Sequence, residues 1–145
     1  MAEECVIDTT VLQRANIALT SRTAERRRFR RRLVLLNTLR EGRKILLVSE
    51  QLAVEYHRQI KRPLNDYVKT FFELLVDPQR RVLNWTNWPA ARRQKARKCR
   101  YPREDDHVLR TAIRPHATTI FAEENRMIRA DKCIHRHFKV HIREP

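Results

Sequence analysis

The chain has 145 residues, of which 41% are hydrophobic, so it is long and apolar enough for one globular domain and is not a wholly disordered chain. It has no apolar run near the ~18 residues that a membrane span needs and no signal-peptide pattern at its start, so we expect a cytoplasmic protein without a membrane partner. Lysine and arginine outnumber aspartate and glutamate by 32 to 17, and this excess predicts a polyanionic partner, nucleic acid before all others.

The predicted elements of the first half alternate between β-forming runs and helical patterns. The run CVIDTT predicts a strand at residues 5–8, and apolar residues at helical spacing predict a helix at residues 24–40. Gly42 follows where a helix C-terminal cap is expected. A continuous apolar run then predicts a buried strand at residues 45–48, and Ser49 is placed to cap a helix that continues to about residue 60.

The second half continues the alternation. Pro63 is placed to begin a further helix with one apolar stripe. The remaining predictions are a short strand at residues 82–85, a basic loop, a helix at 105–113, and strands at 119–122 and 138–142. Strands separated by helices predict one α/β domain over residues 1–145, a three-layer α/β/α sandwich with a central, mostly parallel sheet.

The cysteines predict a reducing compartment. Cys5, Cys99 and Cys133 are far apart, odd in number and without CxxC spacing, which argues against a disulfide framework and against a zinc ribbon. We therefore expect free thiols, as in a reducing cytosol.

Acidic residues follow several of the predicted strands, although the chain as a whole is poor in acid. In a parallel sheet, ligands bind at the carboxyl ends of the strands, so these side chains are expected at one edge. Carboxylates gathered without basic partners repel one another, and a bound divalent cation relieves that repulsion. Each acid taken alone also has a simpler explanation, a solvated position or the dipole at a helix start, although Asp8 at the end of a strand is the hardest to explain in this way. The residues are Asp8, Glu55, Asp105, Asp106, Glu123 and Glu124.

Four segments give this pattern a family resemblance: VIDTTVL, LLVSEQLAVEYHRQI, PREDDHVLRTA and TTIFAEENRMI. In this order, over nearly the whole chain, they resemble the PIN-domain ribonucleases, in particular the small prokaryotic members regarded as toxins of toxin–antitoxin pairs. The resemblance implies a PIN-like fold and an endoribonuclease that binds Mg²⁺ or Mn²⁺ and directs water at a phosphodiester. It implies as partners RNA, an antitoxin protein and a second copy of the chain. It places the catalytic residues at Asp8, Glu55, Asp106 and Glu124, and the metal ligands at Asp8, Asp105, Asp106 and Glu124.

Two alternatives stay open beside the nuclease interpretation. After the fourth predicted strand, the family usually has a small polar residue and then Asp, whereas this chain has Ala122 followed by Glu123 and Glu124. The same surface therefore also fits a nucleic-acid-binding module that has lost turnover. The target of a nuclease is open as well, because nothing in the sequence separates RNA from single-stranded DNA.

A basic run precedes the predicted helix at 105–113. Its lysines and arginines have no acidic neighbour within the run and are predicted to contact phosphates. They are Arg92, Arg93, Lys95, Arg97, Lys98, Arg100 and Arg103. Trp85, Trp88 and Tyr101 flank the run and are expected either to stack on unpaired bases or to pack within the protein. A second arginine run at residues 26–32 is weaker evidence for a nucleic-acid-binding surface, because its side chains are spread around a helix.

A histidine cluster, HRHFKVH, near the end of the sequence offers further candidate metal ligands. In an extended segment His135 and His137 would share one face and, with His141, offer nitrogens to a transition metal. No cysteine or acid nearby completes a familiar ligand pattern, so we expect a strand-face or nucleic-acid-facing role instead.

Overall fold

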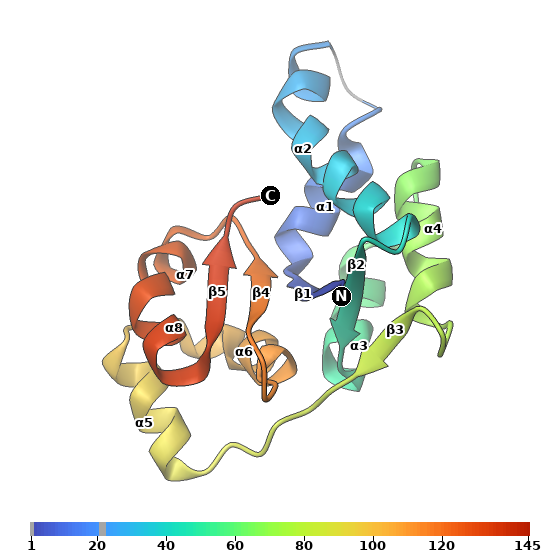
Figure 1. Ribbon diagram of the computed structural model, residues 1–145. Coiled ribbons are helices and arrows are strands. Elements are labelled where there is room, and N and C mark those ends of the chain that lie inside the picture. Colours follow the sequence, from blue (N-terminus) through green and yellow to red (C-terminus); the bar gives the residue numbers. More distant parts are fainter. Residues whose placement is uncertain (1, 21–22) are drawn as a thin grey trace.

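The computed structural model describes residues 2–20 and 23–145, and the side chains of residues 23–28 lie outside that description. Within these residues, five parallel strands form one sheet in the order β3-β2-β1-β4-β5 (Figure 1). The strands are β1 (Glu3–Ile7), β2 (Lys44–Val48), β3 (Arg81–Leu83), β4 (Thr118–Phe121) and β5 (Val140–Arg143). The predicted α/β class with a parallel central sheet is confirmed.

Helices connect the strands and cover both faces of the sheet. Right-handed crossovers place the connections from β1 to β3 on one face and those from β3 to β5 on the other. Accordingly, α1, α2 and α4 pack together, while α6 packs against β1, β2 and β4. The helices are α1 (Thr9–Ile17), α2 (Thr23–Arg40), α3 (Glu50–Gln59), α4 (Asp66–Leu75), α5 (Ala90–Lys98), α6 (Asp106–Ala112), α7 (Asn125–Arg129) and α8 (Asp131–Phe138), with a 3-10 turn, η1 (Arg103–Asp105), before α6.

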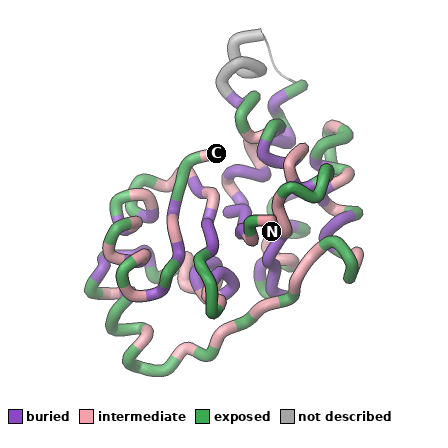
Figure 2. Tube along the Cα trace, viewed as in Figure 1, coloured by how far each residue is buried: buried purple, intermediate pink, exposed green. Residues whose placement is uncertain are grey.

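The hydrophobic core lies along the carboxyl-terminal halves of the central strands. The last residues of β1 and β2 are buried, as is most of β4 (Figure 2). A parallel strand covered on both faces needs such a continuous apolar run, which is why these strands were predictable from the sequence. No helix within the described residues is both long and apolar enough to cross a membrane.

The ends of the early helices follow from single residues. Gly42 adopts a φ of 77°, which an L side chain rarely adopts, and its N–H donates to the Leu39 carbonyl at 3.1 Å. This turn ends α2 as predicted. The hydroxyl of Ser49 accepts a hydrogen bond from the backbone N–H of Leu52 at 3.2 Å, which confirms Ser49 as the N-cap of α3.

Three local predictions are wrong. The segment predicted as a basic loop contains a helix, α5, because its alanine, arginine, lysine and glutamine residues are all strong helix formers. The helix expected to start at Pro63 begins later, since Asn65 caps α4 by accepting from the Val68 N–H at 3.0 Å. The last strand begins at Val140 because Phe138 belongs to the buried stripe of α8, and the left-handed Lys139 ends that helix.

The expectation of free thiols is wrong for two of the cysteines. Cys99 and Cys133 form a disulfide, with a Cα–Cα distance of 5.4 Å. They are 34 residues apart, and only the docking of the end of α5 against α8 brings them together, so their spacing gave no signal. Cys5 is free and buried in β1, and burial raises the pKa of its thiol to about 12.

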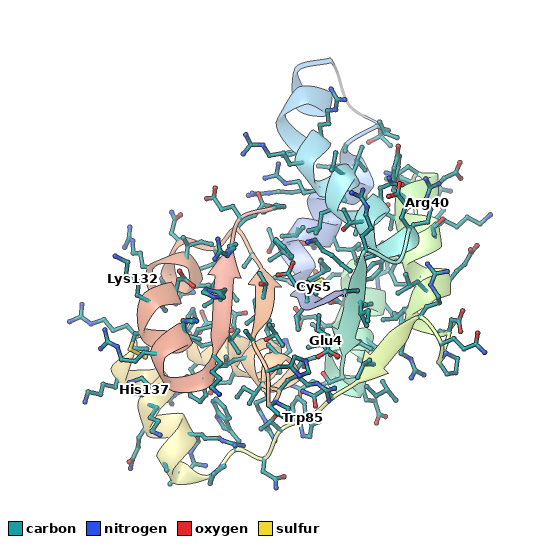
Figure 3. The ribbon with its side chains drawn as sticks, viewed as in Figure 1. Glu4, Cys5, Arg40, Trp85, Lys132 and His137 are labelled. Atoms are coloured by element: carbon teal, nitrogen blue, oxygen red, sulfur yellow. A yellow bond between two sulfur atoms is a disulfide. The ribbon has the colours of Figure 1, made fainter. Side chains whose placement is uncertain are left out.

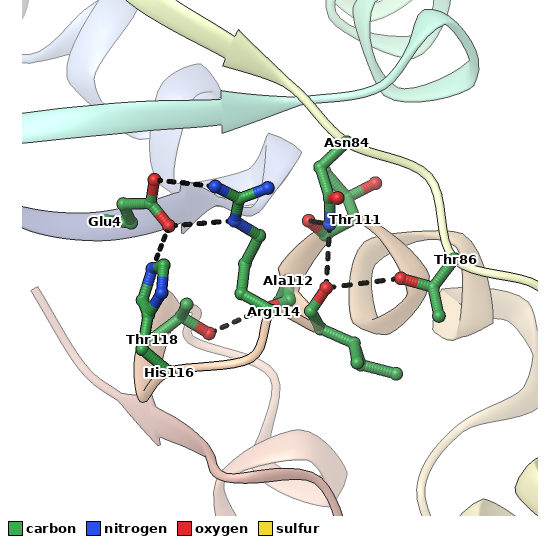
Figure 4. Close-up of polar contacts among 9 residues, drawn as sticks. Glu4, Asn84, Thr86, Thr111, Ala112, Arg114, His116 and Thr118 are labelled. Atoms are coloured by element: carbon green, nitrogen blue, oxygen red, sulfur yellow. Dashed lines mark hydrogen bonds and ion pairs between the residues drawn. The ribbon is translucent and has the colours of Figure 1, made fainter.

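Polar contacts hold α6 and the turn that follows it (Figure 4). The side chain of Asn84, directly after β3, donates to the Ile113 carbonyl at 2.9 Å, and the Thr86 hydroxyl donates to the same carbonyl at 3.2 Å. Beyond the turn, Arg114 forms an ion pair with Glu4 of β1 at 3.0 Å. These contacts fix α6, whose first turn contributes to the site described next, relative to β3 and β1.

Candidate functional site

Asp8 occupies the point where β1 ends and α1 begins. The strand order reverses between β1 and β4 at this edge, and in open α/β sheets the crevice outside such a switch point is where ligands bind. The backbone N–H of Asp8 donates to the Phe121 carbonyl of β4 at 2.9 Å, and the buried Tyr56 hydroxyl donates to the Ile7 carbonyl. The main chain that carries Asp8 is therefore held from both sides.

The Asp8 side chain is buried beside other acids. The residue is only 5% exposed. Burial, together with the neighbouring carboxyls of Asp105 and Glu55, raises the pKa of the Asp8 carboxyl from 3.8 to about 7. The backbone N–H of Thr9 and the His107 ring lower that pKa in part.

Glu55 of α3 and His107 of α6 form a hydrogen-bonded ion pair next to Asp8. The hydroxyl of Thr9 also donates to Glu55 Oε1 at 2.7 Å. The hydrogen bond from His107 lowers the pKa of Glu55, assisted by the one from Thr9. Burial alone would lower the pKa of His107, but the hydrogen bond and the charge of Glu55 outweigh it and raise that pKa. Glu55 is thus a fixed, ionised carboxylate.

Asp105 completes the group from η1. Burial raises the pKa of its carboxyl to about 6, and the carboxyls of Glu104, Glu124 and Glu55 contribute in the same direction. Tyr101, which is 2% exposed, fixes this turn by donating from its hydroxyl to the Asp105 carbonyl at 2.9 Å.

Asp106, the neighbour of Asp105, is engaged elsewhere. Its carboxylate forms an ion pair with Arg97 of α5 and accepts from the Trp88 indole N–H at 3.3 Å. The resemblance placed the third catalytic acid at Asp106, but in the structure it is Asp105 whose charge acts on Asp8. Asp106 instead docks the basic helix α5 onto the start of α6.

The two glutamates after β4 also differ in their partners. The side chain of Glu123 is 6% exposed and pairs with Arg14 of α1 at 2.8 Å and with Arg32 of α2. Glu124 caps α7 by accepting from the Met127 N–H at 3.0 Å, and it pairs with Arg126 at 2.8 Å. Glu123 therefore joins helices, while Glu124 remains at the edge where its charge reaches Asp105.

We refer to Asp8, Glu55, Asp105 and Glu124 as the acidic cluster. Its most buried member, Asp8, is electrostatically strained in the way that a bound cation would relieve. Among the described side chains, the carboxylate oxygens here do not meet in a group of three within 4.8 Å. A cation such as Mg²⁺ takes one or two direct carboxylates and keeps several of its waters, so it does not need three such oxygens that close together.

An open cleft of about 960 Å³ adjoins the cluster along α3. Glu55, Asp105 and His107 line it, as does Trp85. Trp85 is 44% exposed (Figure 3). The Arg110 guanidinium lies 3.8 Å from its ring centroid. An exposed indole at the wall of a cleft is suited to stacking on an unpaired base.

The other two flanking aromatics pack within the protein. Tyr101 is buried, and Trp88 stacks on Phe138 of α8 with the ring centroids 6.1 Å apart. Of the two roles expected for Trp85, Trp88 and Tyr101, base stacking remains a prediction for Trp85 alone.

The basic run surrounds a second hollow, of about 520 Å³, which we call the basic pocket; it is lined by Trp88, Arg93, Gln94, Arg97, Arg103 and Asp106. Arg97 is paired with Asp106, which follows the run, so this cation is not free for a phosphate in the way that the lack of acids within the run predicted. The other basic side chains have different surroundings: Arg92 donates to the Asn87 carbonyl at 3.0 Å, while Arg93, Lys95, Lys98, Arg100 and Arg103 are exposed. In the arginine run at residues 26–32, the side chains of 26–28 lie outside the described residues, and Arg30 and Arg31 are exposed.

Sequence reasoning missed His107 and Thr9 as partners of Glu55. Both lie one residue after a candidate acid, Thr9 after Asp8 and His107 after Asp106. Their adjacency to strand-end and helix-start acids was the available signal, but which side chain each would contact depends on how α3 meets α6. The histidine prediction is wrong in its geometry, because His135 and His137 lie on helix α8.

Comparison of the chain with protein-family models, with curated proteins and with solved structures finds no match in any of the three.

Proposed function

We propose that the chain is a metal-dependent nuclease that hydrolyses phosphodiester bonds of RNA, with Mg²⁺ or Mn²⁺ held at the acidic cluster. The observation that carries the proposal is the Asp8 carboxyl, buried at the topological switch point beside Asp105, with its pKa raised to about 7. A buried carboxyl that is disfavoured as an ion gains most from a cation. The PIN-domain resemblance of the four sequence segments supports the same function.

Each part of the site has a role in this reaction. A bound divalent cation supplies a water of lowered pKa and neutralises charge on the phosphate. Asp8 and Asp105 are the carboxylates that would hold it, and Glu55, ionised and fixed by Thr9 and His107, would be placed to accept a hydrogen bond from a water and orient it. The basic pocket beside α5 grips the phosphate backbone, and Trp85 stacks on a base in the cleft.

The test is cleavage of labelled RNA and labelled single-stranded DNA in Mg²⁺, Mn²⁺ or EDTA. We expect cleavage of RNA with metal, none with EDTA, and a loss of at least about 100-fold in Asp8→Asn, since a ligand carboxylate is removed. Glu73→Gln is the matched control, because Glu73 is an exposed acid on α4, away from the switch edge. Equal activity of Asp8→Asn and the control would refute the metal site.

A binding module without turnover is the second candidate. It is favoured by one observation: Glu123 is locked between Arg14 and Arg32, and Glu124 is engaged by Arg126, so neither acid after β4 is free. Tight RNA binding without cleavage in any metal would select this alternative. Faster cleavage of DNA than of RNA would instead identify single-stranded DNA as the substrate. We also propose a cytoplasmic location and, from the resemblance, an antitoxin protein as partner, which co-purification of a coexpressed candidate would test.

A further inference from the structure

A second group of potential metal ligands lies where α5 meets α8. Cys99 is the C-cap of α5, and Cys133 lies on α8. His137 lies on the same helix (Figure 3). Their sulfur and imidazole nitrogen atoms all lie within 4.8 Å of one another. Among the described residues, no other group of three or more His, Cys, Asp or Glu side chains has its ligand atoms this close together.

The geometry suits a tetrahedral transition metal. Cys133 and His137 are four residues apart on one helix, so both side chains project from the same face, and Cys99 approaches from a second element. Around Zn²⁺, with bonds of about 2.3 Å to sulfur and 2.0–2.1 Å to nitrogen, neighbouring ligand atoms are about 3.5–3.8 Å apart. Reduction of the disulfide leaves the two sulfurs free to separate to that distance.

The same two sulfurs serve either chemistry but not both. In the structure they are joined as a disulfide, which leaves His137 beside a bond that offers no thiolate. Soft thiolate and imidazole ligands select zinc-like ions over Mg²⁺, so this group is distinct in chemistry from the acidic cluster.

We propose that Cys99, Cys133 and His137 form a Zn²⁺ site in the reduced protein, and that the Cys99–Cys133 disulfide is the metal-free, oxidised form of the same site. A dithiol reductant passes two electrons and two protons to the disulfide, which becomes two thiols while the reductant closes its own disulfide. Zn²⁺ then displaces both thiol protons and bonds to the two thiolates and to the neutral nitrogen of His137, with water in the fourth position.

The other histidines of the cluster are set apart from this site. His135 stacks on His141 of β5 with ring centroids 3.8 Å apart, on a different side of α8 from His137. His141 Nδ1 lies 3.9 Å from a carboxylate oxygen of Asp131. His135 is therefore a matched control: it is on the same helix and of the same chemistry, but outside the ligand group.

The site joins α5, which carries the basic run, to the rest of the domain. Beyond this link, α5 is held by the Arg97–Asp106 pair and by the single buried side chain of its own length, Ala96. Either a disulfide or Zn²⁺ keeps the end of α5 docked, so the basic helix stays in place in oxidising and in reducing surroundings.

The experiment titrates Co²⁺, and then Zn²⁺ as competitor, into the full chain with the disulfide reduced or intact. We expect tetrahedral Co²⁺ bands with thiolate charge transfer, saturating at one ion per chain, in the reduced protein only, and their loss when Zn²⁺ is added. His137→Ala should weaken Co²⁺ binding at least about 10-fold, and His135→Ala should leave it unchanged. Melting curves run in parallel should show Zn²⁺ raising the melting temperature of the reduced protein but not of the oxidised protein.

Two results would overturn the proposed Zn²⁺ site. A reduced protein with a full thiol count and no thiolate–Co²⁺ absorption overturns the proposal, as does equal binding by the two histidine variants. Because Asp8→Asn leaves these ligands intact, its Co²⁺ spectrum should match the wild type even if every cleavage assay fails. The Zn²⁺ site therefore stands or falls independently of the nuclease proposal.

Discussion

The carboxyl of Asp8 keeps its proton to a higher pH in the folded chain than in the unfolded one, because burial and the nearby acids disfavour its charge. The folded state therefore binds more protons than the unfolded state between pH 3.8 and about 7, and stability falls as the pH rises through that window. The loss of folding free energy that comes from ionising the buried Asp8 carboxyl is fully present above pH 7 and absent below pH 3.8. In the absence of metal, this one residue lowers the stability of the fold at neutral pH.

Replacing Asp8 by Asn should therefore stabilise the metal-free protein at high pH and not at low pH. At pH 8 we expect the variant to be more stable by roughly 4 kcal/mol, the value of a shift of about three pKa units. At pH 3 the difference should nearly vanish, since the wild-type carboxyl is then mostly neutral in both states. Chemical denaturation in EDTA at both pH values measures this. A variant that is less stable than wild type at pH 8 would show that Asp8 is satisfied by the fold alone.

Asp105 and Asp106 are neighbours with different roles in the structure, which the sequence could not distinguish. Asp105→Asn should reduce metal-dependent cleavage at least about 100-fold, because it removes a carboxylate that acts on Asp8. Asp106→Asn breaks the ion pair with Arg97 and should chiefly weaken RNA binding through a loosened α5. Rates under saturating RNA, compared with binding affinities, distinguish the two effects. The assignment fails if Asp106→Asn gives the larger loss of saturated rate.

Helix α5 is the element whose role differs most between sequence and structure. It presents a row of exposed cations with little of its surface in the core, since Ala96 is its one buried residue. Such a helix is held by its ends, through Arg97, Cys99 and the aromatic stack of Trp88. Its exposed face is then available for phosphates, whereas Arg97 is already committed.

Replacing Arg93, Lys95 and Lys98 by Gln should weaken RNA binding about equally across sequences. The slope of log affinity against log salt should flatten by roughly 0.7 for each lost contact on a single strand. The triple variant Lys61, Arg62 and Lys69 to Gln removes the same charge from exposed positions before and within α4, and it should leave the slope near the wild-type value. Fluorescence anisotropy over a salt series gives both slopes. Equal slopes in the two triple variants would place the RNA path elsewhere.

At the scale of the whole molecule, the parts of the fold that were predictable are those fixed by local pattern. The apolar run of β2, the cap at Ser49 and the turn at Gly42 each depend on a few neighbouring residues. The disulfide and the split between Asp105 and Asp106 depend on how α5 docks, which involves residues far apart in sequence. The topology alone predicts that the acids lie at one edge of the sheet, but it does not predict which carboxylate contacts which partner.

Because the acidic cluster lies at the junction of β1, α3 and η1, a cation bound there should stabilise the whole domain, and should do so in a pH-dependent way. Binding requires the charged forms of Asp8 and Asp105, whose pKa values are raised to about 7 and about 6, so affinity should increase as the pH rises through this interval. Mn²⁺ at 100 times its dissociation constant would contribute about 2.7 kcal/mol. We expect Mn²⁺ to raise the melting temperature clearly at pH 8 and hardly at pH 5.5, with no rise at either pH in a variant that carries both Asp8→Asn and Asp105→Asn. A rise at pH 8 that survives in this double variant would place the metal outside the cluster.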